Sequence, residues 1–231
     1  MIQTINPVIR REDLLHAVIF DLDGVLLDTE KLYARFWREA AIELGYPMTH
    51  AQAIGMRSLN KAAAQAQLER YFGPGVSHPA MREKRIELME AYIATHGVEL
   101  MPGAERVLRK LSDFGFAVGL ATSSPIDRVR RYLSPYGLLH YFDTIVTGYD
   151  VRNGKPAPDI YILAAEQLGY TPSQCVAVED SPAGIQSAYH AGCVTVFIPD
   201  QDDLDDSIVD KVYAKADILT DLLTVVKEDM K

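Results

Sequence analysis

The sequence predicts an α/β fold in which a parallel β-sheet carries helices on both faces and a helical segment is inserted after the first strand. Short apolar runs closed by polar residues recur along the 231-residue chain, and helical patterns separate them. Strands that alternate with helices are typical of a parallel sheet covered on both sides. Residues 30–101 break this alternation, because they contain helical patterns only. We therefore expect a core with one inserted unit.

Five short apolar runs are the predicted strands. The first, Ala17–Phe20, ends in Asp21-Leu22-Asp23-Gly24. A β-branched and aromatic run closed by an acidic turn and glycine is typical of a buried parallel strand. The other four predicted strands are 116–121, 144–147, 174–178 and 193–198. Ligands of such sheets bind at the carboxyl ends of the strands, so the polar residues after these runs are the first candidates for a functional site.

Apolar spacing and end signals predict the helices. The core helices are expected at 104–114, 158–168 and 182–191, with Gly169 and Gly192 after the last two and Ser181 as an N-cap. Further helices are expected at 30–44, 58–72 and 79–96, where Pro and Gly separate them. A single crossover is too short to hold these three helices. We expect residues 1–29 and 102–231 to form the core, and residues 30–101 to form a helical cap.

Charge and composition exclude several classes of protein. The chain has 23 Lys and Arg against 32 Asp and Glu, a net charge of −9, which argues against a general nucleic-acid binder. Cys175 and Cys193 lie among apolar residues in no metal-ligand spacing, which favours buried, reduced thiols. No apolar run approaches the ~20 residues of a membrane helix, and Met1 to His16 lack the apolar run of a signal peptide. We expect a cytoplasmic monomer without membrane or nucleic-acid partners.

Three carboxylates are predicted to meet at the ends of buried strands. Asp21 and Asp23 follow the first strand, and Asp180 follows the run 174–178. A single acid in such a place is usually a loop cap, but three of them repel each other unless a cation is present. Oxygen ligands without a Cys or His cluster suit Mg²⁺.

Hydroxyl and ammonium groups are expected at the same edge. Thr122 and Ser123 end the second strand, and Lys155 lies in Gly154-Lys155-Pro156-Ala157-Pro158, where two prolines stiffen the loop. Taken alone, Thr122 is a helix cap and Lys155 a surface lysine. Beside the carboxylates and a metal ion, they indicate a site for a phosphoryl group.

These motifs resemble the haloacid dehalogenase superfamily, and more narrowly its branch of β-phosphoglucomutases and sugar-phosphate phosphatases. The string Asp21 to Glu30 is similar to the first family motif, and three more follow in the family's order: Thr122-Ser123-Ser124, Gly154 to Asp159 and Val178 to Ile185. The resemblance spans roughly residues 17 to 200. It implies a Rossmann-like core with a helical cap.

The resemblance also implies a role for each motif residue. Asp21 is the expected nucleophile and forms an aspartyl-phosphate, while Asp23 protonates the leaving oxygen and then activates water. Thr122 and the Ser123 amide are expected to hold the phosphoryl group, and Lys155 to neutralise its charge. The expected Mg²⁺ ligands are Asp21, the backbone carbonyl of Asp23, Asp180 and, in or near the coordination shell, Glu179. An acid at Asp23 disfavours dehalogenation.

Substrate choice is expected to depend on the cap. Arg57, in a segment that resembles the family's specificity loop, either clamps a second anionic or hydroxyl group of the substrate or is an exposed residue before a helix. Tyr33 and Trp37 either line the pocket or pack the helical bundle, and packing is favoured.

The sequence disfavours three alternatives to a phosphatase. A β-phosphoglucomutase-type isomerase carries a His on the first cap helix, where this chain has Tyr33. A receiver-like signalling module has its motifs in another order and lacks the insertion. A phosphonoacetaldehyde hydrolase needs a buried cap lysine, and Lys61 and Lys84 lie beside polar residues. We therefore expect a Mg²⁺-dependent phosphatase of small phosphorylated metabolites, most simply sugar phosphates, with the mutase as the alternative.

Overall fold

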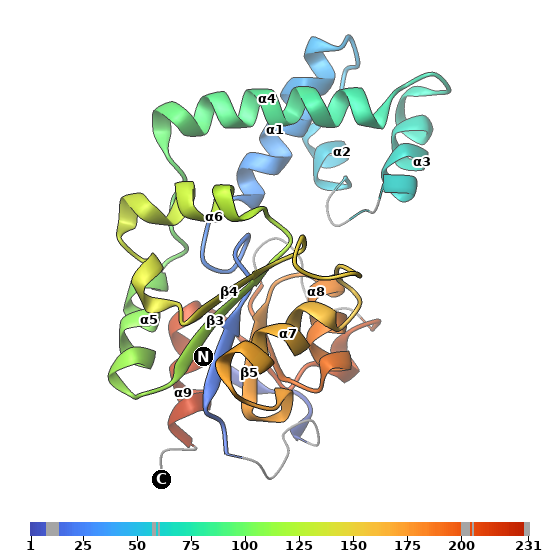
Figure 1. Ribbon diagram of the computed structural model, residues 1–231. Coiled ribbons are helices and arrows are strands. Elements are labelled where there is room, and N and C mark those ends of the chain that lie inside the picture. The colour runs from blue at the N-terminus through green and yellow to red at the C-terminus, as the bar shows by residue number, and fades with distance from the viewer. Residues whose placement is uncertain (8–13, 57–58, 60, 200–203, 205, 229–231) are drawn as a thin grey trace. The chain divides into compact units, whose positions relative to one another are not determined.

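The computed structural model describes residues 1–7, 14–56, 59, 61–199, 204 and 206–228. The chain forms two compact units, one made of Met1–Leu27 with Leu100–Lys231 and the other of Asp28–Glu99 (Figure 1). The boundaries expected from the sequence, at 30 and 101, lie two residues further along the chain. Arg57 falls outside the described residues.

Over the residues that the structure describes, the first unit contains a sheet of seven strands in the order β1-β7-β6-β5-β2-β3-β4. All neighbouring strands are parallel except β1, which pairs antiparallel with β7. The strands are β1 (Ile2–Thr4), β2 (Ala17–Phe20), β3 (Ala117–Thr122), β4 (Thr144–Thr147), β5 (Cys175–Glu179), β6 (Val194–Phe197) and β7 (Ala214–Ala216). The predicted α/β fold with a Rossmann-like parallel sheet is confirmed.

The five predicted strands form within one residue of their expected ends, whereas β1 and β7 were not predicted. Each of these two strands has only three residues, and Gln3, Thr4 and Lys215 give them no apolar run. They pair across the length of the chain, with Ile2 opposite Ala216. The strands therefore depend on a long-range pairing that a local pattern cannot indicate.

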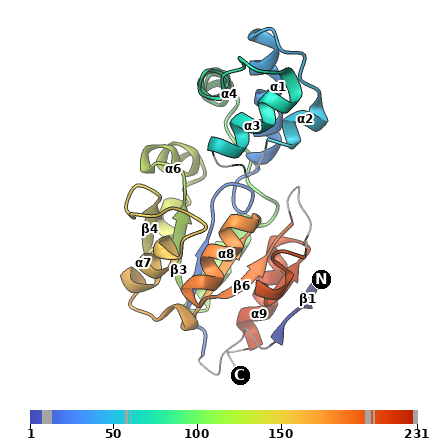
Figure 2. The same ribbon diagram turned by 90° about the vertical axis from the view of Figure 1, so that its right-hand side faces the viewer.

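Helices cover both faces of this sheet. α7 (Asp159–Leu168) and α8 (Pro182–Ala191) pack together on one face, while α5 (Ala104–Asp113) and α9 (Leu222–Glu228) lie on the other (Figures 1 and 2). α6 (Ile126–Leu133) follows β3. The ends of α8 are as predicted: the Ser181 hydroxyl accepts the Gly184 N–H at 3.1 Å, and Gly192 follows the last turn with φ 94°.

Apolar side chains buried between the sheet and α7 stabilise the strands whose ends form the site. Ile19 of β2 and Ala177 of β5 point to this side and are fully buried with Ile160 and Ala164 of α7. Small side chains on both the helix and the strands let their backbones approach closely. Full burial of a side chain such as Ile19 contributes about 1.5–3 kcal/mol, so this packing fixes the strand ends against each other.

The second unit is helical, with α1 (Glu30–Glu43), α2 (His50–Ile54), α3 (Lys61–Phe72) and α4 (His78–His96). Three of these four were predicted, but α2 has five residues, too few for an apolar period. Trp37 packs in the core of this unit, as favoured from the sequence. The Arg85 guanidinium lies 4.6 Å from the ring centre of Tyr33 and 5.1 Å from that of Trp37.

Both cysteines are free and buried, as expected. Burial raises the pKa of Cys175 to about 12 and that of Cys193 well above its ordinary value, so both remain thiols at neutral pH. Among the described residues, no helix combines the length and apolar character that crossing a bilayer requires.

Candidate active site

The candidate site lies at the carboxyl ends of three adjacent strands. β2 pairs with β5 on one side and β3 on the other, so that Phe20 stands beside both Val178 and Leu120. The residues that follow must therefore emerge at one edge. Asp21 remains tied to β5, because its backbone N–H donates to the Val178 carbonyl at 3.0 Å.

The Lys155 ammonium joins two carboxylates at this edge. Its Nζ lies 2.6 Å from Asp21 Oδ1 and 2.6 Å from Glu179 Oε1, and it also donates to the Ala121 carbonyl at 2.9 Å. The three side chains are 8%, 11% and 0% exposed. Charge-assisted hydrogen bonds in such a dry setting are stronger than surface ion pairs. Lys155 therefore forms a buried ion-pair bridge with Asp21 and Glu179 at the edge where it was expected, and is not a surface lysine.

The opposite charges of Lys155 and of the Asp21 and Glu179 carboxylates offset part of the cost of burying these groups. Burial raises the pKa of Asp21, and the Lys155 ammonium counteracts this rise. Burial by itself would lower the pKa of Lys155, but the charges of Asp21 and Glu179 outweigh it and raise that pKa above its usual range. Lys155 therefore stays a cation next to Asp21.

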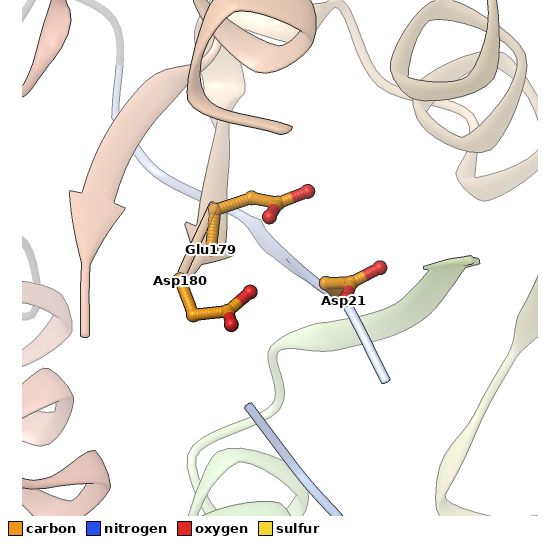
Figure 3. Close-up of side chains that lie close together, drawn as sticks. All are labelled: Asp21, Glu179 and Asp180. Carbon is orange, nitrogen blue, oxygen red and sulfur yellow. The ribbon is translucent and has the colours of Figure 1, made fainter. Parts of the chain in front are cut away.

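A third carboxylate completes a set that suits a metal ion. Oxygen atoms of Asp21, Glu179 and Asp180 lie within 4.8 Å of one another, and all three residues are buried (Figure 3). Three buried carboxylates around one ammonium leave an excess of negative charge. A hard cation would compensate it, and oxygen donors without nitrogen or sulfur suit Mg²⁺. The residues present therefore fit the predicted metal.

The Asp23 side chain is not part of that set. Its Oδ2 accepts a hydrogen bond from the Ser124 hydroxyl at 2.9 Å. The Ser124 N–H in turn donates to Thr122 Oγ1 at 3.0 Å, and Thr122 is fully buried whereas Ser123 is exposed. The end of β3 thus holds Asp23 in one orientation, while the predicted metal ligand of this residue is its backbone carbonyl.

Comparison with known proteins identifies the family to which the chain belongs. A family model described as a haloacid dehalogenase-like hydrolase matches residues 15–192. The chain belongs to this family. The resemblance found in the sequence motifs is therefore confirmed, and so is the prediction of an enzyme of this class.

Two curated relatives carry phosphatase names. The chain is 35% identical over 179 residues to the fructose-1-phosphate phosphatase YqaB of Escherichia coli, with 76% of this chain and 92% of the relative covered. It is 31% identical over 193 residues to the phosphorylated carbohydrates phosphatase of Thermotoga maritima, with 79% and 84% covered. These names support the phosphatase class within the family.

A solved structure shows the same fold. The β-phosphoglucomutase of Clostridium difficile superimposes with a TM-score of 0.73, covering 94% of this chain and 97% of that one at 22% identity. At this identity, the likeness concerns the fold alone. The fold by itself therefore does not distinguish a phosphatase from a mutase for this chain.

Of the site residues predicted for this hydrolase, all that the structure describes lie at one sheet edge. They are Asp21, Asp23, Thr122, Ser123, Lys155, Glu179 and Asp180. Their roles stay predictions. Sequence reasoning missed Tyr161, whose hydroxyl donates to Glu179 Oε1 at 2.7 Å, because an aromatic residue at core spacing in α7 indicates only packing.

Two glycines lie directly against the carboxylates of this hydrolase. A Cβ on Gly24 would lie 2.2 Å from Asp180 Oδ2, and one on Gly184 would lie 2.0 Å from Glu179 Oε2. Gly24 also has φ 80°. Both glycines therefore leave the space that the carboxyl groups occupy.

Replacing Gly24 with alanine is expected to disturb the site through Asp180. Gly115→Ala is the matched control, because Gly115 has φ 78° and open space where a Cβ would lie. The control is expected to lose about 1–2 kcal/mol of stability from the backbone conformation alone. Gly24→Ala is expected to lose more and, at the predicted metal site, to weaken the binding of Mg²⁺ about 10- to 100-fold, as is usual when the support of a ligand is lost. Thermal melts and titration calorimetry measure both, and equal behaviour of the two variants would refute the steric argument.

Proposed function

We propose that this hydrolase is a Mg²⁺-dependent phosphatase of small sugar phosphates that forms an aspartyl-phosphate on Asp21. The observation that carries the proposal is the buried Asp21 carboxylate, held 2.6 Å from the Lys155 ammonium beside the carboxylates of Glu179 and Asp180. Relatives named for fructose 1-phosphate and for phosphorylated carbohydrates support the substrate class.

In the proposed first step, a carboxylate oxygen of Asp21 attacks phosphorus and the ester P–O bond breaks. The electron pair of that bond leaves with the substrate oxygen, which takes a proton from Asp23. An anionic nucleophile approaching an anionic phosphoryl group needs charge neutralisation, and the ammonium of Lys155 supplies part of it. The Thr122 hydroxyl and the Ser123 amide would bind the phosphoryl oxygens.

In the proposed second step, water attacks the phosphorus of the aspartyl-phosphate. Asp23 accepts the proton of this water, inorganic phosphate leaves, and the Asp21 carboxylate is regenerated. The hydrogen bond from Ser124 at 2.9 Å keeps Asp23 oriented in both steps. An acid and base of this kind typically contributes about 10²- to 10⁴-fold in rate.

The Mg²⁺ ligands in this proposal are Asp21, Glu179, Asp180 and the backbone carbonyl of Asp23. When bound, the ion would supply positive charge to the phosphoryl oxygens and orient them. Its charge would also favour the ionised form of Asp21, which the attack requires.

We further propose that the unit Asp28–Glu99 is the cap that selects the substrate, with Arg57 as a candidate contact. Closing of such a unit would exclude water from the reaction. A monomeric enzyme in the cytoplasm completes the proposal, and the two buried thiols support the reducing compartment.

A mutase is the second candidate. Mutases of the family carry a His at the position of Tyr33, and a phenol cannot exchange protons in the same way near neutral pH. Tyr33 lies against the Arg85 guanidinium within its own unit. This difference favours hydrolysis over return of the phosphoryl group.

A phosphate-release screen tests the proposal. Sugar phosphates, polyol phosphates and nucleotides are incubated with the full chain in Mg²⁺ or in EDTA, and β-glucose 1-phosphate is also followed for glucose 6-phosphate. We expect Mg²⁺-dependent release of phosphate, fastest with sugar or polyol phosphates. Formation of glucose 6-phosphate with little free phosphate would instead establish the mutase.

A further inference from the structure

We propose that Tyr161 is a positioning residue: its hydroxyl fixes the Glu179 carboxylate in the orientation in which Glu179, with Asp21 and Asp180, binds Mg²⁺. This inference rests on the proposed function, because it presupposes the proposed Mg²⁺ site. Tyr161 itself takes no direct part in either chemical step.

Tyr161 touches the charged bridge in two ways. Its hydroxyl donates to Glu179 Oε1 at 2.7 Å, the same oxygen that accepts the Lys155 ammonium at 2.6 Å. The Lys155 Nζ also lies 5.2 Å from the centre of the Tyr161 ring, within the range of a cation–π contact. Tyr161 is fully buried in the first turn of α7. Tyr161 therefore contacts both Glu179 and Lys155, the first through its hydroxyl and the second through its ring.

These contacts decide which oxygen of Glu179 faces which neighbour. Oε1 accepts from Tyr161 and Lys155, while the Ser181 hydroxyl reaches Oε2 at 3.3 Å. The missing Cβ of Gly184 leaves room for the carboxyl group on that side. Without the Tyr161 hydroxyl, Oε1 would keep one donor fewer, and the carboxylate would be freer to rotate about its last torsion angle.

The hydroxyl is an addition to what packing requires. Ile160, Ala164 and Ala165 of α7 bury an apolar face against the sheet, and a phenylalanine ring at 161 would fill the same space. Burying a hydroxyl without a hydrogen bond is unfavourable, because the group loses its contacts with water. The phenol is a neutral O–H donor near pH 7, and here it donates to Glu179 Oε1. Packing alone would not require a hydroxyl at this position, whereas its hydrogen bond to Glu179 gives the hydroxyl a role.

The test compares two Tyr→Phe variants of the full chain. Tyr161→Phe removes the hydroxyl at the site. Tyr213→Phe is the control. Tyr213 is also buried, at 6% exposure, but it directly precedes β7 and so lies at the amino end of a strand, whereas the site lies at the carboxyl ends. Mg²⁺ binding is measured by titration calorimetry without substrate, and initial rates are measured over a range of Mg²⁺ concentrations.

Tyr161→Phe is expected to raise the Kd for Mg²⁺ about 10-fold and to lower the rate at limiting Mg²⁺ by a similar factor. Saturating Mg²⁺ is expected to restore most of the rate, with KM for the phosphate ester within about 2-fold of wild type, since the hydroxyl acts through the metal ligand. Tyr213→Phe is expected to bind Mg²⁺ like the wild type.

Two results would overturn the inference, and they are distinguishable. If Tyr161→Phe binds Mg²⁺ like the wild type and differs only in melting temperature, Tyr161 is a core residue and the proposed function stands. If the wild type itself binds no Mg²⁺, the proposed metal site fails, and the role of Tyr161 fails with it.

Discussion

Replacing Asp21 with asparagine is expected to lower kcat by at least about 10⁴-fold, the size of effect seen when a covalent nucleophile is removed. The amide has nearly the shape of the carboxylate but carries no charge and is a poor nucleophile. The variant is expected to fold, because Lys155 keeps its contact with Glu179 at 2.6 Å and the cluster loses one of several mutually repelling charges. Initial rates of phosphate release and a melting curve in EDTA measure the two effects.

The matched control for this variant is Asp113→Asn. Asp113 is an exposed aspartate whose carboxylate pairs with Lys110 at 2.9 Å on the surface of the core unit. The same change of charge is expected to leave the rate and Mg²⁺ dependence unaltered there. Mg²⁺-dependent turnover by Asp21→Asn at a rate comparable to that of the control would rule out Asp21 as the nucleophile.

Replacing Lys155 with methionine is expected to have the second largest effect. The variant keeps the unbranched shape of the side chain, one atom shorter, but leaves the buried carboxylates of Asp21 and Glu179 without their shared ammonium. Breaking a buried ion pair in this way costs about 3–5 kcal/mol of unfolding free energy. Phosphate release is expected to be lost as well, because the negative charge around the phosphoryl group is no longer compensated.

Urea denaturation in EDTA and in Mg²⁺ tests this prediction. We expect Mg²⁺ to stabilise Lys155→Met more than it stabilises the wild type, since the ion would replace part of the missing charge. Lys110→Met removes an exposed lysine and is expected to cost within about 1 kcal/mol under both conditions. Equal stability of Lys155→Met and wild type in EDTA would show that the bridge is not a stabilising element.

The sequence allowed the fold and the site edge to be predicted because both depend on local patterns. The run Ala17–Phe20 closed by Asp21 and Asp23 forms β2, and the strands on either side of it are two of the other predicted runs. Parallel strands end at one edge, so residues that follow them are brought together whatever the details of packing. Lys155 was assigned to the site for a different reason, namely its proline-flanked loop and the resemblance of Gly154 to Asp159 to a family motif.

The remaining features depend on contacts between distant segments. The hydroxyl of Tyr161 meets Glu179 only because α7 packs against β2, β3 and β4, and Ser124 meets Asp23 only because β3 lies beside β2. The requirement for Gly24 comes from Asp180, far along the chain. In each case, the residue type alone indicates packing, a turn or a helix cap. The role of the residue depends on a contact with a distant segment, which the local sequence does not indicate.

Trapping the intermediate tests the central claim most directly. The enzyme is mixed with a sugar phosphate and Mg²⁺, quenched during turnover and treated with borohydride, which reduces an acyl phosphate to an alcohol and so converts an aspartyl-phosphate to homoserine. Peptide mass spectrometry then locates the change. We predict homoserine at position 21 when substrate is present and aspartate there when it is absent. Phosphate release with position 21 unmodified, or with the change at another carboxylate, would contradict the account.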